Sequence, residues 1–269
     1  MNKNIIFLII SLISSPSFSA YNGANKNHGQ KAGWQLTLGA ASIFSPMFEG
    51  SGNYGLSILP NIRAAYSDKF FASIPEGVGY NFSSSRAWRY GPLIKLRFSR
   101  KEDASYSPFN VTGDTDELKG LGNISAAGEI GGFVSYRTNK LKYKMELRQG
   151  FGGHEGFIGN FKINTFGSLG KFRYSFGPEI EYASTDYVDT YFGINAQQEI
   201  NSGLNQYKAS GGITHVGIGG MLLRSINKNV MLTIFANYKR LAGDVAASPI
   251  VRQGSSNQFI LGVGAGYNF

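Results

Sequence analysis

The sequence has no cysteine among its 269 residues, so disulfides cannot contribute to its stability. After the first residues, it also has no run of about 20 apolar residues, the length that a membrane-spanning helix needs. These absences exclude a disulfide-stabilised fold and a helical membrane protein. Two classes remain, a soluble protein and a closed β-barrel, the other structure that satisfies all its backbone groups in lipid.

The first residues, MNKNIIFLIISLISSPSFSA, have the features of a secretory signal peptide. Lys3 precedes the apolar run Ile5 to Ile13, and Ser17 and Ser19 fit a small-x-small cleavage site. This run is too short to cross roughly 30 Å of hydrocarbon as a helix. We predict a signal peptide at residues 1–19, with cleavage after Ala20 as the alternative. The formal net charge of +9 on an exported protein favours anionic lipid, lipopolysaccharide or murein over nucleic acid as a partner.

Most of the chain after residue 33 alternates between apolar and polar residues, with no long 3.6-residue period, which predicts an all-β protein. The third window of alternation runs without a break from Phe70 to Phe82. The eleven windows start near Trp34, Leu56, Phe70, Trp88, Asn123, Leu141, Phe157, Lys171, Gly211, Val230 and Asn257.

Aromatic residues on the apolar faces favour a membrane barrel over a soluble sandwich. They recur ten residues apart, in the pairs Trp34 and Phe44, Trp88 and Phe98, Phe172 and Tyr182, and Phe259 and Phe269. Ten residues of tilted strand rise about 25 Å along the membrane normal, which is the distance between the two aromatic girdles of such barrels. We therefore predict that the apolar faces meet lipid and that the charged faces line the lumen.

The fold class that we predict is a single transmembrane antiparallel up-and-down β-barrel over residues 34–269, preceded by a flexible segment, 20–33. Single-chain bacterial barrels have an even number of strands, so eleven windows leave one strand missed or one window false. We predict about 12 strands, with 10 as the alternative. The missed strand is expected within one of the long connections, 100–122 or 184–210.

The lumen faces carry charges of both signs that could form pairs. Lys142, Lys144 and Arg148 of one strand could pair with Glu129 of the preceding strand. Across the barrel, Lys95 and Arg97 could face Glu179 or Glu181. One interpretation is a lumen filled by compensated charge, and the other is a narrow pore that favours anions.

No catalytic, cofactor-binding or metal site is predicted. The three histidines, His28, His154 and His215, show no metal-ligand spacing and no specific pairing with a serine nucleophile. The adjacent His154 and Glu155 are expected to make a polar contact in a loop. The surrounding glycines indicate a tight turn of special shape.

Nine stretches, in this order, carry a resemblance to a known family. They are SPMFEGSGNYG at 45–55, LP at 59–60, YGPLIKLRFSR at 90–100, LKGLGNI at 118–124, GGHEG at 152–156, DTYFGI at 189–194, SGLNQY at 202–207, YKRLAGDVAASPIV at 238–251 and the closing GAGYNF. In these stretches the chain resembles the MltA-interacting protein family of outer-membrane proteins, also called the MipA/OmpV family.

The resemblance implies a non-enzymatic barrel in the outer membrane of a Gram-negative cell. The namesake of the family is a scaffold that links a lytic murein transglycosylase to a murein synthase. Other members are osmolarity-responsive proteins, antigens or adhesins, so a small passive channel or a surface antigen is the alternative function. The family has no catalytic residues to transfer. Its motif residues are expected to pack across the barrel mouth, with a partner-binding patch as the alternative: Pro46, Glu49, Gly50, His154, Glu155, Tyr191, Phe192, Gly193, Asp244, Ser248 and Pro249.

Connection lengths predict an orientation. Short periplasmic turns and long outer loops are typical of such barrels, which places 184–210 and 242–256 outside and the terminal Phe269 at the inner girdle. A murein enzyme would then meet the segment Tyr21 to Gly33 and the turns around Lys140, Lys171 and Lys228. The sequence leaves the oligomeric state open.

Overall fold

The computed structural model describes residues 33–269 except 84, 86 and 104–108. The predicted signal peptide, His28 and nearly all of the segment 20–33 lie outside the described residues.

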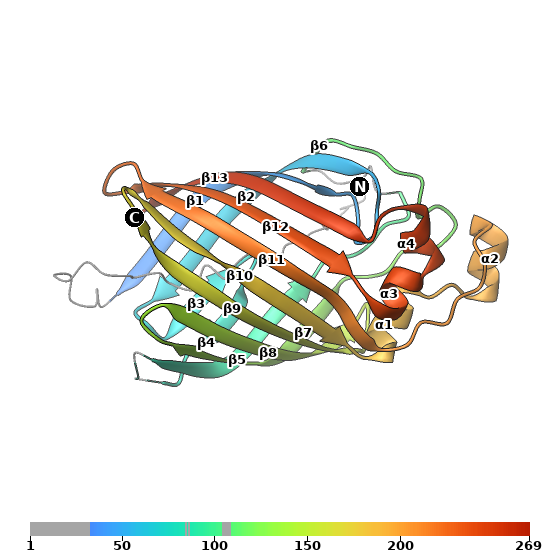
Figure 1. The fold of residues 1–269 in the computed structure, drawn as a ribbon, viewed down its shortest axis with the longest axis horizontal. Helices are drawn as coiled ribbons and strands as arrows, with labels where there is room; N and C mark the ends of the chain where they lie inside the picture. Colours follow the sequence, from blue (N-terminus) through green and yellow to red (C-terminus); the bar gives the residue numbers. More distant parts are fainter. Residues whose placement is uncertain (1–32, 84, 86, 104–108) are drawn as a thin grey trace, which may run out of the picture.

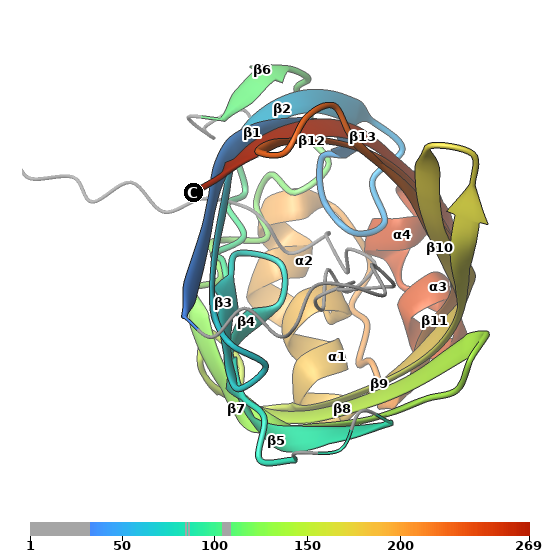
Figure 2. The ribbon, with the colours of Figure 1, turned by 90° about the vertical axis from the view of Figure 1, so that its left-hand side faces the viewer.

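Twelve antiparallel strands form a closed barrel, as predicted (Figures 1 and 2). The last strand pairs with the first from Thr37↔Asn268 to Phe44↔Leu261, which closes the ring. The strands are β1 (Trp34–Pro46), β2 (Tyr54–Tyr66), β3 (Phe70–Ser73), β4 (Gly77–Tyr80), β5 (Trp88–Arg97), β7 (Ala127–Arg137), β8 (Leu141–Gly152), β9 (Phe157–Leu169), β10 (Phe172–Ala183), β11 (Gly212–Ser225), β12 (Val230–Leu241) and β13 (Asn257–Asn268).

The twelfth strand lies where the sequence predicted a single one. The window from Phe70 to Phe82 is divided into β3 and β4 by a turn at residues 74–76. Pro75 has no N–H for a strand ladder, and Gly77 has a φ of +79°, which favours glycine.

The predicted position of the missing strand, within 100–122 or 184–210, is therefore wrong. In its described part, the first connection forms one short strand, β6 (Asn110–Thr112), which pairs with β2 outside the ring of twelve. The second forms two helices, α1 (Thr185–Phe192) and α2 (Ala196–Ser202).

The outer surface carries the apolar faces of the strands. Most of the aromatics predicted to lie ten residues apart are exposed on it: Trp34, Phe44, Trp88, Tyr182, Phe259 and Phe269. Phe98 is an exception because β5 ends at Arg97, and the ring packs against an apolar cluster that includes the inward-facing Phe235 and Ile260. The exposed apolar belt is the surface that meets lipid.

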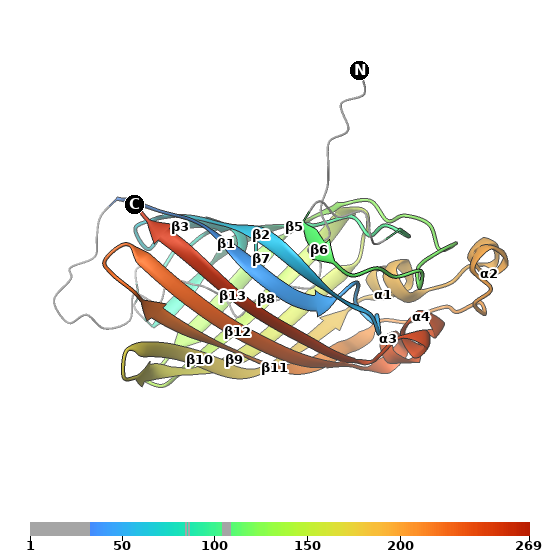
Figure 3. The same cartoon turned by 90° about the horizontal axis from the view of Figure 1, so that it is seen from above.

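The two ends of the barrel differ. Short turns connect β2 to β3, β7 to β8, β9 to β10 and β11 to β12, and the C-terminus lies at the same end (Figures 1 and 3). The opposite end carries α1, α2, α3 (Gly243–Ala247) and α4 (Pro249–Gln253). In the described part of the chain, no helix has the length and apolar character needed to cross a membrane.

Candidate functional site

The helix-bearing mouth of the barrel is covered by a helical cap, which we define as α1, α3, α4 and the segments between and beside them. Tyr187 and Val188 of α1, Val245 of α3 and Val251 of α4 are buried in one apolar cluster with Ile158 of the wall. A neighbouring cluster joins Phe48, Leu118, Leu121 and Ile250. Burial of this many apolar side chains fixes the helices onto the barrel.

Hydrogen bonds connect the cap segments. The Ser248 hydroxyl donates to the Phe192 carbonyl at 2.7 Å and also accepts from Ile250 N at the start of α4, where Pro249 is the first helical residue. Tyr207 Oη donates to the Asp244 carbonyl at 2.9 Å. The family stretches DTYFGI and LAGDVAASPIV are therefore hydrogen-bonded to each other within the cap.

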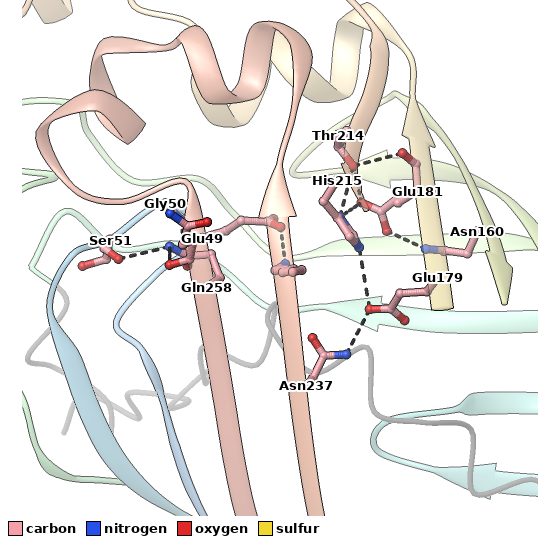
Figure 4. A network of polar contacts seen from close by, with 12 residues as sticks. Glu49, Gly50, Ser51, Asn160, Glu179, Glu181, Thr214, His215, Asn237 and Gln258 are labelled. Carbon is pink, nitrogen blue, oxygen red and sulfur yellow. Dashed lines mark hydrogen bonds and ion pairs between the residues drawn. The ribbon is translucent and has the colours of Figure 1, made fainter. Parts of the chain in front are cut away.

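Most of the remaining motif residues lie at this same mouth. Gly50 N donates to Gln258 Oε1 at 3.2 Å, and the Gln258 amide donates to the Ser51 carbonyl (Figure 4). Glu49 forms an ion pair with Lys239 of β12. A Cβ on Gly193 would lie 2.4 Å from Asp189 Oδ1, so any larger residue at this position would clash. Pro46 is buried at the end of β1, whereas Glu155 is exposed.

Beneath the cap, Glu129 of β7 is the centre of a buried ion-pair network. Its carboxylate lies 2.6 Å from Arg97 Nε of β5 and 3.2 Å from Arg148 Nη1 of β8. Glu129 is only 1% exposed. A buried carboxylate is stabilised only when it is paired and hydrogen-bonded, and these contacts meet that requirement.

His154 is the third partner of Glu129. Its Nε2 lies 3.3 Å from Glu129 Oε1, and its Nδ1 accepts a hydrogen bond from Gly156 N at 3.2 Å. Because Nδ1 accepts, the proton of the neutral ring lies on Nε2 and points to the carboxylate. His154 makes a polar contact from the loop between β8 and β9, as predicted, but its partner is Glu129, which is distant in sequence, and not Glu155. His154 is buried, whereas Glu155 is exposed.

The glycines around His154 allow this packing. A Cβ on Gly150 would lie 2.1 Å from the His154 ring, and one on Gly156 would lie 2.4 Å from the Tyr187 backbone nitrogen. The predicted special turn is present at Gly152, which has a φ of +99°.

Aromatic rings of α1 cover the network. Arg97 Cζ lies 4.9 Å from the ring centre of Tyr187 and 5.7 Å from that of Tyr191, within the range of cation–π attraction. The His154 ring meets the Tyr187 ring edge-on at 5.1 Å. Burial, which disfavours the phenolate, raises the pKa of Tyr187 well above its usual value, and it also raises the pKa of Tyr191.

The network continues around the wall. Glu146 accepts from Lys95 Nζ at 2.7 Å and from Lys144 Nζ at 2.6 Å. Arg148 donates to Asn160, and Asn160 Nδ2 donates to Glu181 at 2.7 Å (Figure 4).

A further group of contacts lies on β9 to β12. Thr214 Oγ1 donates to Glu181 Oε1 at 3.0 Å. Glu179 accepts from Lys162 Nζ at 2.5 Å and from Asn237 Nδ2 at 3.1 Å (Figure 4). His215 lies between the two carboxylates, 3.8 Å from Glu179 and 3.7 Å from Glu181.

The predicted lumen pairs are partly correct. Arg148 pairs with Glu129 as predicted, but Lys144 pairs with Glu146 of its own strand. Lys95 and Arg97 form their ion pairs with Glu146 of β8 and Glu129 of β7 rather than with Glu179 or Glu181. Arg97 still interacts electrostatically with Glu181, as predicted. Tyr187 was not singled out from the sequence, although it lies two residues before the DTYFGI stretch.

Most charged side chains of this arrangement are paired with each other, which stabilises the structure. Thr214 Oγ1 lies 3.0 Å from Glu181 Oε1 and 3.3 Å from His215 Nδ1. The carboxylate is the nearer acceptor and is charged, so it accepts the hydrogen bond of the hydroxyl. Within the described ranges, no group of three or more His, Cys, Asp or Glu side chains is placed to hold a metal ion.

Comparisons with known proteins identify relatives of the chain. The family model described as MltA-interacting protein MipA matches residues 38–269. Outer membrane protein OmpV of Vibrio cholerae serotype O1 is 36% identical over 279 residues, and the match covers 100% of both chains. Outer membrane protein Omp26La of Vibrio anguillarum is 36% identical over 281 residues, again with full coverage of both.

Among solved structures, an outer membrane channel from Pseudomonas putida F1 matches with a TM-score of 0.46 and 9% identity, covering 92% of this chain and 99% of that one. The NanC porin matches with a TM-score of 0.44 and 7% identity, covering 86% and 98%.

Proposed function

The chain belongs to the MltA-interacting protein MipA family of outer-membrane barrels, and on this premise we propose that it is a non-enzymatic scaffold for murein-processing enzymes. The family name supplies the first partner, a lytic murein transglycosylase. A murein synthase is the second partner, as in the scaffold that the sequence resembles.

The observation that carries the proposal is the difference between the two ends of the barrel. The cap and the ion pairs beneath it occupy the lumen at the helix-bearing mouth. In barrels of this class the short turns face the periplasm, where murein lies. The short-turn end therefore offers the partner surface, with the exposed side chains of Lys140, Lys171 and Lys228 on it.

Capture of a purified lytic transglycosylase by the detergent-solubilised barrel tests this function. The variant Lys140→Gln/Lys171→Gln/Lys228→Gln should weaken capture roughly threefold or more and make it less sensitive to salt, because exposed charge pairs contribute about 0.2–1 kcal/mol each.

The matched control removes the same charge at the opposite end, with Lys101→Gln/Lys119→Gln/Lys208→Gln, all exposed in the wild type. This control should bind the enzyme normally. Loss of capture by the control, with normal capture by the turn variant, would contradict the proposed orientation or the scaffold itself.

A passive channel is a second candidate, because charged side chains line the lumen on β5 and β7 to β10. Planar-bilayer conductance distinguishes the two functions. A scaffold with a capped, ion-paired lumen should pass little current, whereas steady conductance by the wild-type barrel would favour the channel.

A further inference from the structure

Charge is distributed unevenly along the lumen. Near the cap, the acids Glu129, Glu146, Glu179 and Glu181 alternate with Arg97, Arg148 and Lys162. Near the short turns, basic side chains predominate. The basic vestibule, as we define it, consists of Arg63 on β2, Arg89 on β5, Arg137 on β7, Lys142 on β8 and Arg173 on β10.

All five side chains point into the lumen, because they alternate along their strands with the exposed apolar residues of the outer face. In the described part of the chain, the acidic side chains at this end are Asp68 and Glu76. Asp68 lies 3.3 Å from Arg89, and Glu76 lies 3.9 Å from Arg63. Positive charge is thus in excess in the vestibule.

The strand register places like charges opposite each other. Arg137 of β7 and Lys142 of β8 are direct cross-strand partners on the lumen face. Directly opposed like charges destabilise a sheet pair, and an anion placed between them lowers this cost. The Arg137 guanidinium is also held in position, 3.9 Å from the ring centre of Phe166.

Solvent reaches the vestibule but hardly reaches the network under the cap. The side chains of Arg63 and Arg89 are 20% and 29% exposed, whereas Glu129 and Arg148 are 2% and 5% exposed. On β13 and β1, which are also part of the wall, several inward residues towards the short turns are small: Gly264, Gly266, Thr37 and Ala41. The basic side chains near the short turns, which are all at least partly exposed, are therefore more accessible to solvent than the network under the cap.

We propose that the basic vestibule binds a small multivalent oxyanion, bearing carboxylate or phosphate groups, that enters through the short-turn mouth. Rings of Arg and Lys side chains select anions in pores, and the planar guanidinium matches both carboxylate and phosphate. A ligand with several negative charges offsets the repulsion between Arg137 and Lys142, which no monovalent ion does as well. The site is separate from the exposed turn lysines of the proposed scaffold.

Titration calorimetry on the full-length, detergent-solubilised barrel tests the site, with citrate and pyrophosphate as probes and the neutral sugar raffinose for comparison. The wild type should bind at least one of the two anions, with an affinity that falls as salt rises, and should not bind raffinose. Binding of citrate alone assigns a carboxylate site, and binding of pyrophosphate alone assigns a phosphate site.

Two lumen variants locate the binding. Arg137→Gln/Lys142→Gln/Arg173→Gln should lower the affinity about tenfold or more, and the charge-preserving Arg137→Lys/Lys142→Arg should keep it within about threefold. The folding control is heat-modifiable migration of each variant on gels. If the charge-preserving variant folds and loses binding as completely as the neutral one, the site does not depend on charge and the proposal fails.

The turn variant Lys140→Gln/Lys171→Gln/Lys228→Gln removes the same charge at the same end, outside the lumen, and should bind the anion normally. Absence of anion binding by the wild type, or an equal loss in the turn variant, would overturn the proposal. Capture of the transglycosylase should be weakened in the turn variant and unchanged in the neutral lumen variant. Failure of the scaffold function and failure of the anion site can therefore be recognised separately.

Discussion

Glu129 shows how one buried side chain holds several elements together. It joins Arg97 of β5, Arg148 of β8 and His154 of the following turn. The network therefore joins neighbouring strands of the barrel. It also supports the cap, because Arg97 contacts the Tyr187 ring of α1.

Replacing Glu129 by glutamine should be among the most damaging single changes in the lumen. The substitution leaves Arg97 and Arg148 buried without their shared carboxylate, and breaking a buried pair costs about 3–5 kcal/mol. Urea unfolding in detergent, followed by heat-modifiable migration, should show this loss. Glu155→Gln, at the exposed neighbour of His154, is the control and should leave the unfolding midpoint unchanged.

The raised pKa of Tyr187 predicts that alkaline pH destabilises the cap. Burial raises its pKa in the folded protein above the unfolded value of about 10. The stabilisation is therefore fully present below about pH 10 and is lost as pH rises through the folded pKa. Alkaline titration followed by tyrosinate absorbance should show a late-titrating class that is missing in Tyr187→Phe. Identical titration of the two proteins would show that Tyr187 is not buried under the cap.

At the scale of elements, the sequence predicted most of the wall and little of the cap. Alternation and aromatic spacing identify strands because each residue of a barrel strand faces either lipid or lumen. Pro75 and Gly77 divide one window into β3 and β4, a short hairpin that alternation alone does not show. The helices of 184–210 and 242–256 are five to eight residues long, too short to give a clear 3.6-residue pattern.

The candidate site was predicted less completely than the fold. The lumen-facing charges were correct, because the pleat determines the face. Arg148 and Glu129 apart, their partners were not, because the shear of the barrel sets which residues of different strands meet, such as Lys95 with Glu146 and Arg97 with Glu129. The partner of His154 was missed because Glu129 is distant in sequence.

The attachment of α1 depends on a close approach at Gly156. An added Cβ there would lie within 2.7 Å of three Tyr187 atoms, two of them backbone, so Gly156→Ala should displace α1 without unfolding the barrel. Limited proteolysis should cleave within 184–210 much faster in this variant. Gly128→Ala is the control, since its Cβ would meet nothing within 4 Å. Equal cleavage of the two variants would show that α1 is not held at this point.

Phe269, at the end of β13, is expected to serve assembly more than stability. Phe269 is 70% exposed, and its backbone nitrogen donates to the Leu36 carbonyl at 3.0 Å. Deleting Phe269 should lower the yield of inserted barrel in envelopes and hardly change the unfolding midpoint of barrel already folded. Phe259→Ala, at the other end of the same apolar face, should insert normally. Normal insertion of the truncated chain would argue against this role.

At the scale of the whole molecule, the two ends of the barrel differ in structure and in proposed role. The helix-bearing end is closed by packed apolar side chains and buried ion pairs. The short-turn end presents exposed lysines around the mouth and a basic vestibule inside it. Both features favour partners and ligands at the short-turn end, which the proposed orientation places in the periplasm.

Site-specific photo-crosslinking in intact envelopes tests the central claim most directly. A photoreactive residue would be placed at the exposed Asn139 or Asn227 in the short turns, and at the exposed Gln197 in α2. The account predicts crosslinks to a lytic murein transglycosylase from the turn positions and none from α2. Crosslinks to that enzyme from Gln197 alone, or from none of the three positions, would contradict it.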